Sequence, residues 1–358
     1  MEGMIKDHVK RILLIKHRNI GDVLLATPTI KTLRETFPHA YIAMVVNSGT
    51  EEMVTGNPYL DEIIVFVRDL KRLPILTRFR RQAQFIFDIR KRNFDLAINL
   101  TEGDRGAILC LFSGARYRVG YESGGRGFLG KNHIFTHLVK PDPRSHVVEH
   151  NLDAVRVLGI EPRSKEVSAY FSREDYECVN YLLKGFGIQE KDFLIHVHPT
   201  SRWLFKCWKD ESFAEVIDWL EMKRKIRVIL TSSPEKKELK KVDTIISMCK
   251  SRPANLAGLL NLKQLIALSK RCGLFLGIDS APMHVAAAMG TPVITLFGPT
   301  REINWGPWGN GHVVIKKDWA CRPCGKDGCN GSKRSLCLEA ITPEEVKNAI
   351  DFKLNAAI

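Results

Sequence analysis

The stretch LFLGIDSAPMHVAAAMGTPVITLFGPT, residues 274–300, decides the fold. It predicts an aliphatic strand, a tight turn, a helix of small residues and a second aliphatic strand. Strands joined through a helix in this way pair in parallel. Gly277 allows a close backbone approach in the first strand, and Asp279-Ser280-Ala281 opens the helix. The free N–H groups at such a helix start bind anions, and a diphosphate is their natural ligand.

His284 lies one turn into this helix, where an imidazole can donate a hydrogen bond to a phosphate oxygen. Two interpretations are open. Asp279 is an ordinary helix cap and His284 a packing residue, or both belong to a ligand site. Their joint occurrence at the carboxyl end of a strand favours the ligand site.

Similar patterns precede this stretch in the second half of the chain. Residues 193–199 (FLIHVHP) predict a strand, and residues 211–225 predict an amphipathic helix. The loop between them contains Thr200 and Lys206, which offer a hydroxyl group and a cation. Lys206 is either a solvated surface lysine, the commoner case, or a cation that neutralises a diphosphate without a metal.

The first half of the chain also alternates aliphatic runs with helical patterns. Strands are predicted over residues 11–16, 41–46, 62–67 and 95–100, and a helix over 29–37. Such alternation indicates a parallel sheet with crossover helices. The expected fold class is α/β, with two Rossmann-like, doubly wound domains that face each other across a cleft. Ligands of such sheets bind beyond the carboxyl ends of the strands.

The length of 358 residues exceeds what one hydrophobic core usually supports, so two domains are expected. A polar connector with a proline, near residues 165–172, separates the two halves. We therefore expect an N-terminal domain over residues 1–170 and a C-terminal domain over 171–342. A C-terminal helix over 343–358 is able to pack back on the N-terminal domain.

The net charge of +14 indicates an anionic partner: nucleic acid, an acidic membrane face or a phosphorylated substrate. Solubility alone is the alternative. The sequence has no RRM, KH, zinc-finger or helix-turn-helix pattern, so nucleic acid is the remote alternative. It contains neither a membrane-spanning apolar run nor a signal peptide, which predicts a cytoplasmic protein.

Residues 125–132, GRGFLGKN, match two phosphate-loop patterns incompletely. Their glycines form G-x-G-x-x-G, and Gly130-Lys131 nearly completes a Walker A motif. Asn132 replaces the Ser or Thr that would reach magnesium, and the next residues predict a strand in place of a helix. No nucleotide loop is expected here.

The run RNIGDVLLATPTIKTLR, residues 18–34, puts Asp22 where a strand turns into a helix. A Gly-Asp pair in that position is most often a helix cap. If it faces a diphosphate site on the other domain, the same carboxylate is the best candidate for a general base.

The pairing of IGDVLLATPTIKTLR with GIDSAPMHVAAAMGTPVITLFGPT resembles the bacterial ADP-heptose:lipopolysaccharide heptosyltransferases. These are inverting glycosyltransferases of family 9 with a GT-B fold. HPTSRWLFKCW, LTEGDRGA and ARYRVGY look most like the heptosyltransferase III branch, which adds the branching heptose of the inner core. Heptosyltransferase I or II, or a GT-B transferase with another nucleotide sugar, are the alternatives.

The resemblance implies that Asp22 is the catalytic base and that Lys206 binds the diphosphate of the donor, ADP-L-glycero-D-manno-heptose. The ribose contact falls near Glu235, with the exact residue left open. The other donor-binding residues that we expect are Thr200, Leu260 (at the adenine), Asp279, Ser280, Ala281 and His284.

Inverting transfer needs a base and a stabilised leaving group, but no covalent intermediate. No two aspartates are separated by a single residue, so the D-x-D metal motif of other transferases is missing. We therefore expect metal-independent transfer without a cofactor. The expected partners are ADP-heptose and a lipid A-core acceptor, with the protein peripherally bound to the cytoplasmic face of the inner membrane.

Residues 68–92 combine many cations with Leu, Ile and Phe at helical spacing. Such a segment either lies on an anionic membrane surface or packs its apolar face on the sheet. Further cations are candidates for the phosphates or carboxylates of the acceptor: Arg18, Arg105, Arg116 and Arg118.

Four of the nine cysteines, Cys321, Cys324, Cys329 and Cys337, lie within 17 residues. C-x2-C followed by two further cysteines resembles a structural zinc site, although the later spacings fit no standard finger. Reduced thiols and disulfides are the alternatives. A catalytic role is not expected.

Overall fold

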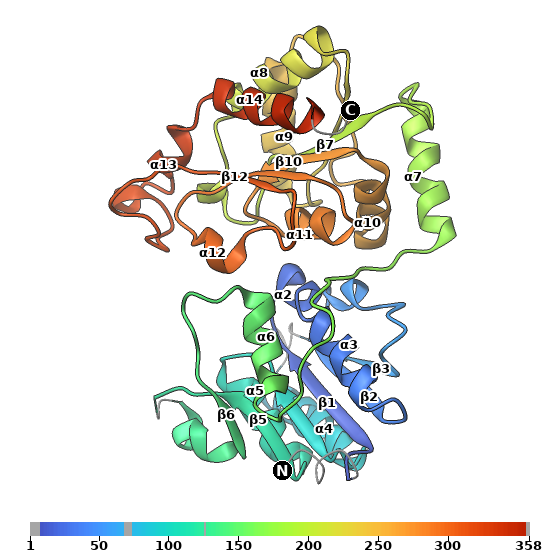
Figure 1. Cartoon of the computed structure of the whole chain (residues 1–358), viewed down its shortest axis with the longest axis vertical. Coiled ribbons are helices and arrows are strands. Elements are labelled where there is room, and N and C mark those ends of the chain that lie inside the picture. Colours follow the sequence, from blue (N-terminus) through green and yellow to red (C-terminus); the bar gives the residue numbers. More distant parts are fainter. Residues whose placement is uncertain (1–7, 68–73, 125–126, 356–358) are drawn as a thin grey trace. The chain divides into compact units, whose positions relative to one another are not determined.

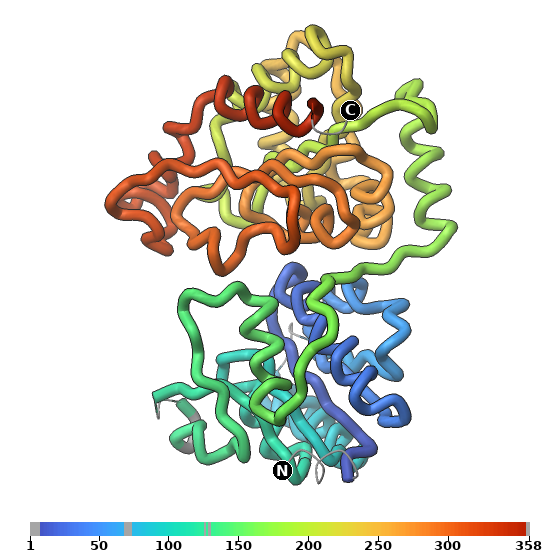
Figure 2. Tube along the Cα trace, viewed as in Figure 1, coloured from blue at the N-terminus to red at the C-terminus, as the bar shows by residue number. Residues whose placement is uncertain are grey.

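The computed structural model of the protein describes residues 8–67, 74–124 and 127–355, without the side chains of 128 and 129. Residues 68–73 of the basic segment and 125–126 of the glycine-rich stretch therefore lie outside it. The chain forms two compact units, residues 1–168 and 169–358 (Figure 1). Figure 2 follows the chain from the N-terminal unit, blue to green, into the C-terminal unit, green to red.

The N-terminal unit contains a parallel sheet of six strands in the order β3-β2-β1-β4-β5-β6. Its central strand carries the aliphatic run Ile12–Ile15, which is completely buried because helices cover both faces. The four expected aliphatic runs all form strands, and the sheet has two further strands. The six strands are β1 (Arg11–Lys16), β2 (Tyr41–Asn47), β3 (Glu62–Phe66), β4 (Leu96–Asn99), β5 (Tyr117–Tyr121) and β6 (His137–Val139).

The helices of this unit pack in pairs, α3 against α6 and α4 against α5. The strand expected directly after the glycine-rich stretch is shorter than predicted, because a 3-10 helix occupies residues 128–134. The bounds of the helices are α2 (Ile20–Leu24), α3 (Thr27–Thr36), α4 (Ile75–Lys91), α5 (Asp104–Ser113) and α6 (Val147–Arg156), with 3-10 turns η1 (Glu51–Met53) and η3 (Phe128–Ile134).

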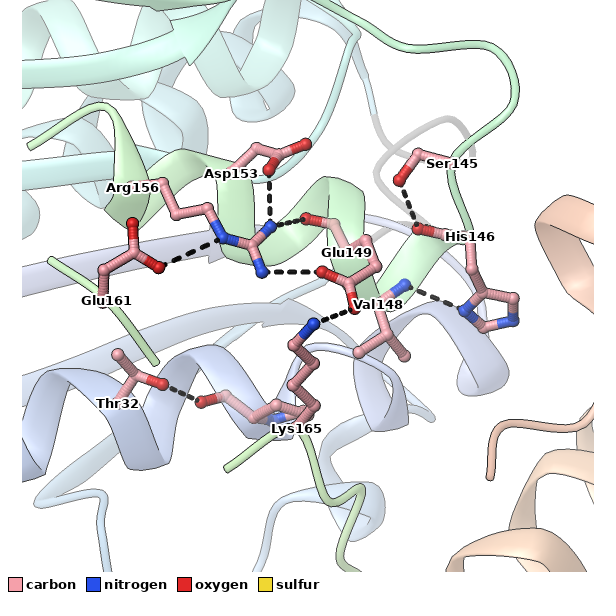
Figure 3. A network of polar contacts seen from close by, with 10 residues as sticks. Thr32, Ser145, His146, Val148, Glu149, Asp153, Arg156, Glu161 and Lys165 are labelled. Carbon is pink, nitrogen blue, oxygen red and sulfur yellow. Dashed lines mark hydrogen bonds and ion pairs between the residues drawn. The ribbon is translucent and has the colours of Figure 1, made fainter. Parts of the chain in front are cut away.

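Ion pairs hold α6 to the segment that follows it (Figure 3). The Arg156 guanidinium donates to Glu149 at 2.7 Å and to Asp153 at 2.6 Å. Lys165 reaches the other Glu149 oxygen at 2.8 Å. Burial raises the pKa of Glu149, but hydrogen bonds from these two cations outweigh it and lower that pKa overall.

The C-terminal unit contains a second parallel sheet of six strands, ordered β12-β11-β10-β7-β8-β9. Gly277 pairs with His198 of the neighbouring strand. A Cβ atom at Gly277 would lie 2.6 Å from the Phe275 ring and 3.0 Å from the His198 carbonyl oxygen, so this position requires glycine. The strands are β7 (Leu194–His198), β8 (Arg227–Leu230), β9 (Ala254–Asn255), β10 (Leu274–Ile278), β11 (Val293–Leu296) and β12 (Val313–Ile315).

The C-terminal helix α14 (Pro343–Asn355) belongs to this second unit. Its Val346 and Ile350 are buried in the same core as Trp208 and Phe213. The other helices are α7 (Arg173–Gly185), α8 (Asp210–Asp218), α9 (Lys236–Met248), α10 (Leu262–Arg271), α11 (Ala281–Ala288), α12 (Glu302–Trp305) and α13 (Leu336–Glu339), with shorter turns η4 (Leu204–Lys206), η5 (Trp219–Lys223) and η6 (Cys329–Gly331).

None of the helices in the described part of the chain has both the length and the apolarity that crossing a membrane requires.

Candidate functional site

Each sheet has a point where the strand order reverses, between β1 and β4 in the N-terminal unit and between β7 and β10 in the C-terminal unit. Open α/β sheets bind ligands beyond the carboxyl ends of the strands at such a point. Asp22 follows β1, Lys206 follows β7 and Asp279 follows β10. Three of the predicted residues therefore lie at these reversal points.

Asp22 is the third residue of the short helix α2 and is 8% exposed. Its Oδ2 accepts hydrogen bonds from the backbone N–H of Asn19 at 3.3 Å and from the Asn19 side-chain amide at 3.5 Å. The carboxylate thus caps its own helix, as the simpler interpretation predicts. No described residue donates a hydrogen bond to Oδ1, so one carboxylate oxygen remains to act on a ligand.

Lys16 is a buried cation that the sequence did not single out. It ends β1 and is 3% exposed, and its Nζ donates to the Leu100 carbonyl at 2.8 Å and to Asn151 Oδ1 at 2.9 Å. Burial lowers the pKa of Lys16 to about 8, while the nearby charge of Asp22 raises it. The sequence signal for such a buried lysine is its position at the end of an otherwise aliphatic run.

Two of the four predicted acceptor arginines lie near Asp22, at the carboxyl edge of the sheet. Arg18 follows β1 and forms an ion pair with Glu102 at 3.7 Å. Arg105, at the start of α5, lies over the Phe66 ring at 4.9 Å. Both are placed to meet an anion at this edge.

Arg116 and Arg118 lie at the opposite edge of the sheet, where β5 begins. Tyr117 pairs with Leu96, which in turn pairs with the early β1 residue Ile12. The Arg118 guanidinium donates to the backbone carbonyls of Ile134 and Ala115, at 2.6 and 2.7 Å. The structure therefore does not bring these two arginines together with Asp22, and it gives Arg118 a role within the fold.

In the C-terminal unit, Lys206 forms an ion pair with Asp279. The Nζ–Oδ2 distance is 2.6 Å, and both side chains are mostly buried. The Lys206 ammonium also lies 5.3 Å from the centre of the Trp203 ring. Lys206 is therefore held at the sheet reversal and is not a solvated surface lysine.

The start of α11 lies directly after this ion pair. Ser280, and not Asp279, is the N-cap residue, although its hydroxyl makes no cap and donates only to the Ile278 carbonyl at 3.4 Å. Ala281 and Pro282 follow, and the proline suits a first turn because its missing N–H is not needed there. His284 is buried one turn further on. The remaining first-turn N–H groups can receive an anion.

The predicted Thr200 is completely buried, and its hydroxyl donates to Glu238 Oε2 at 2.8 Å. Glu235 is exposed at the N-cap position of α9, whereas Glu238, one turn later, is 3% exposed. Glu238 was missed by sequence reasoning, because nothing marks one glutamate in a lysine-rich helix. Leu260 is partly buried against the core of the unit.

The four clustered cysteines lie in the described part of the chain, between the end of β12 and the end of α13. Among the described residues, no three His, Cys, Asp or Glu side chains are arranged to hold a metal ion. All nine cysteines lie in the described part of the chain and are free thiols. Cys321 is exposed, while Cys337 is buried.

Comparison with protein families finds that residues 83–334 match glycosyltransferase family 9 (heptosyltransferase). Lipopolysaccharide heptosyltransferase 3 of Escherichia coli K12 is 35% identical over 289 residues, which are 80% of this chain and 82% of that protein. Lipopolysaccharide core heptosyltransferase OpsX of Haemophilus influenzae is 26% identical over 307 residues, 86% and 84% of the two chains.

Solved structures show the same fold. The glycosyl transferase family 9 protein of Veillonella parvula superposes with a TM-score of 0.82 at 24% identity, covering 97% of both chains. ADP-heptose lipopolysaccharide heptosyltransferase II of E. coli gives 0.77 at 20% identity, covering 97% and 99%. E. coli heptosyltransferase WaaC with ADP gives 0.71 at 18% identity, covering 96% and 99%. The expected GT-B class, with two Rossmann-like units, is confirmed.

Proposed function

Because this chain belongs to glycosyltransferase family 9, the heptosyltransferases, we propose that it transfers heptose from ADP-heptose to an inner-core heptose of lipopolysaccharide. Membership makes it a glycosyltransferase of lipopolysaccharide core biosynthesis. The similarity to heptosyltransferase 3 supports the third-heptose branch over the first and second. The observation in the structure that best supports this proposal is the Lys206–Asp279 ion pair at the start of α11.

The donor diphosphate binds at this ion pair in our proposal. The Lys206 ammonium and the first-turn N–H groups of α11 face the charge that develops on the leaving ADP. Ser280 and His284 add hydrogen-bonding groups on the same helix. Asp279 holds the lysine in place through the 2.6 Å contact.

Asp22 acts as the general base. Its Oδ1 takes the proton of the acceptor hydroxyl while the hydroxyl oxygen attacks the anomeric carbon of the donor. The bond from that carbon to the diphosphate oxygen breaks, and ADP leaves with the bonding electrons. Attack from the face opposite ADP inverts the anomeric carbon. Lys206 and the α11 start supply the positive charge, so the step needs no metal ion.

Membrane association is the second part of the proposal, and α4 supports it. Its second half packs on the sheet, with Ile89 buried in the core of the unit. Its first half is exposed, with Ile75, Leu76 and Phe79 at 68%, 81% and 66% of their full accessible surface. Three arginines share this half: Arg78, Arg80 and Arg81. Apolar side chains among cations suit an anionic lipid surface, where the lipid-anchored acceptor lies.

The decisive experiment measures ADP release from ADP-heptose with lipid A-core acceptors truncated at successive heptoses. We expect release with the acceptor that carries two heptoses. Asp22→Asn is the matched variant, because it keeps an acceptor for the Asn19 N–H but cannot take a proton. It should retain donor binding and lose about 10²–10⁴-fold in rate.

Other outcomes would revise the proposal in defined ways. Release with a shorter acceptor would move the protein to the first- or second-heptose branch. If only a different nucleotide sugar supports the reaction, that sugar would replace ADP-heptose as the proposed donor. An Asp22→Asn enzyme as fast as the wild type would leave Asp22 as a helix cap only.

A further inference from the structure

The side-chain amide of Asn151, in α6, links two buried groups of the N-terminal unit, and the side chain itself is completely buried. Oδ1 accepts a hydrogen bond from the Lys16 ammonium at 2.9 Å, and Nδ2 donates to the backbone carbonyl of Leu25 at 2.9 Å. Lys16 ends β1, and Leu25 is the C-cap residue of α2. One side chain of α6 therefore connects the central strand to the helix that carries Asp22.

The amide of Asn151 fits between these two groups in one orientation only. The Lys16 ammonium can only donate hydrogen bonds, and the Leu25 carbonyl can only accept them. Turning the amide over would set Nδ2 against the ammonium and Oδ1 against the carbonyl, and both hydrogen bonds would be lost. The lysine therefore determines that the amide N–H of Asn151 faces α2.

The end of α2 needs this donor because of the sequence that follows it. Pro28 has no N–H with which to continue the helix, and α3 starts anew after Ala26. In a continuous helix the Thr29 N–H would donate to the Leu25 carbonyl. It donates instead to the Ala26 carbonyl at 3.1 Å. The amide of Asn151 thus supplies the donor that the backbone does not.

The position of Asp22 depends on this contact, because Asp22 lies on α2, three residues before Leu25. A helix of five residues makes few hydrogen bonds of its own, so contacts at its ends determine its orientation. Lys16 also lies close to Asp22: burial lowers the pKa of Lys16, and among the neighbouring charges that of Asp22 has the largest effect on it. Lys16 and Asn151 together therefore hold the end of β1 and the end of α2 beside this carboxylate.

We propose that Asn151, oriented by the Lys16 ammonium, is a positioning residue for Asp22. By holding the end of α2, it keeps the Asp22 carboxylate where it can take the proton of the acceptor hydroxyl. The proposal rests on the role of Asp22 as general base assigned above. Neither Lys16 nor Asn151 takes part in the proton transfer itself.

Steady-state kinetics of ADP release test this positioning role. Asn151→Leu removes the donor to the Leu25 carbonyl and should lower kcat about 10- to 100-fold, because a shift of about 1 Å in a reacting group suffices for such a loss. The KM for ADP-heptose should keep its wild-type value, since the proposed donor-binding residues belong to the C-terminal unit. Lys16→Met alone leaves the Asn151–Leu25 hydrogen bond in place, so its loss of kcat should be smaller.

Thr32→Val is the matched control for Asn151→Leu. It also removes a buried side-chain hydrogen bond, to the Pro28 carbonyl at 2.8 Å, and it lies in α3, which packs against α6. The Thr32 hydroxyl does not contact Lys16 or Leu25, so kcat should stay near the wild-type value. Equal losses of kcat in Thr32→Val and Asn151→Leu would overturn the proposal.

A double variant separates positioning from stability. In Asn151→Leu the buried Lys16 ammonium loses its Oδ1 acceptor, which destabilises the protein. Adding Lys16→Met removes that ammonium, so the double variant should unfold at a higher urea concentration than Asn151→Leu. Its kcat should stay low, because the Leu25 carbonyl still has no donor. Recovery of kcat together with stability would overturn the proposal, and so would a wild-type kcat in Asn151→Leu.

Hydrogen exchange followed by mass spectrometry tests the contact with α2 without any turnover. Peptides that cover residues 20–26 should exchange faster in Asn151→Leu than in the wild type, and Thr32→Val should leave them unchanged. Unchanged exchange in Asn151→Leu would overturn the proposal. Failure of the proposed function alone looks different: the wild type then releases no ADP with any acceptor, while exchange over residues 20–26 still rises in Asn151→Leu.

Discussion

Lys16 is a cation that the fold buries at the end of β1, and its hydrogen bonds bring three elements together. From the end of β1, its ammonium reaches the Leu100 carbonyl, directly after β4, and the Asn151 side chain of α6. Removing a charge from water is costly, and two neutral acceptors compensate only in part. The pKa of about 8 expresses that cost.

The contribution of Lys16 to the free energy of unfolding should become more favourable as the pH rises. Its folded pKa of about 8 is lower than the ordinary lysine value of 10.5, so the unfolded chain holds more protons between these values. We expect the free energy of unfolding of the wild type, relative to Lys16→Met, to increase by up to about 3 kcal/mol from pH 8 to pH 10.5. Urea unfolding at both pH values measures this difference. Lys10→Met, exposed before the same strand, should show no such trend.

Lys206 gives a second prediction at the level of one residue. Lys206→Met removes the cation beside the leaving diphosphate and leaves Asp279 unpaired at the start of α11. We expect kcat for ADP release to fall about 10²–10³-fold, in line with the loss of one charge-stabilising group. Lys241→Met is the control, because it breaks another ion pair of the same unit, with Asp210, and should leave kcat near the wild-type value. Equal effects of the two variants would contradict a role for Lys206 at the diphosphate.

At the level of helices and strands, α4 combines two roles along its length. Ile89 and its neighbours anchor the second half on the sheet. The first half carries apolar side chains and arginines into solvent. Sequence periodicity alone left packing and membrane binding as alternatives, because it does not show how far the sheet extends under a helix.

Binding of vesicles tests the first half of α4. We expect the wild type to co-sediment with vesicles of phosphatidylethanolamine and phosphatidylglycerol, and the double variant Leu76→Glu, Phe79→Glu to lose most of this binding. Both side chains are exposed, so thermal stability should change by no more than about 0.5 kcal/mol. Tyr181→Glu, exposed on α7, is the matched control and should bind normally. Equal loss in both variants would show that added negative charge, and not α4, is responsible.

Strands were easier to predict than site contacts. Aliphatic runs such as residues 11–16 and 274–278 can only form strands of a sheet covered on both faces, and they do so. The helix expected over 211–225 is instead α8 to Asp218, followed by a π-helical segment to Lys223. Hydrogen-bond partners across the sheet depend on register, which no local pattern contains.

The two units of the molecule share the same arrangement of strands and charged residues. Each unit has six parallel strands, a reversal of strand order and a lysine beside an aspartate near that reversal. The sequence predicted both sheets because strand and helix patterns alternate in each half. It singled out Asp22, Lys206 and Asp279, each of which comes after a strand that borders the reversal. The residues that bind the acceptor were harder to predict, because the sequence around an isolated arginine does not show at which edge of the sheet it lies.

The net positive charge of the whole chain supports the last prediction, which is that transfer needs no metal ion. The chain has 54 Lys and Arg against 40 Asp and Glu, and no D-x-D pair to hold a metal–diphosphate complex. Side chains and the α11 start therefore provide the positive charge in our proposal, and EDTA should leave the rate of ADP release unchanged. Added salt should slow the reaction instead, because it screens exposed cations. Kinetics after dialysis against EDTA, with magnesium or manganese then restored, measure the effect. A rate that falls in EDTA and returns with either ion would contradict metal independence, because Lys206 would then be insufficient to hold the leaving charge.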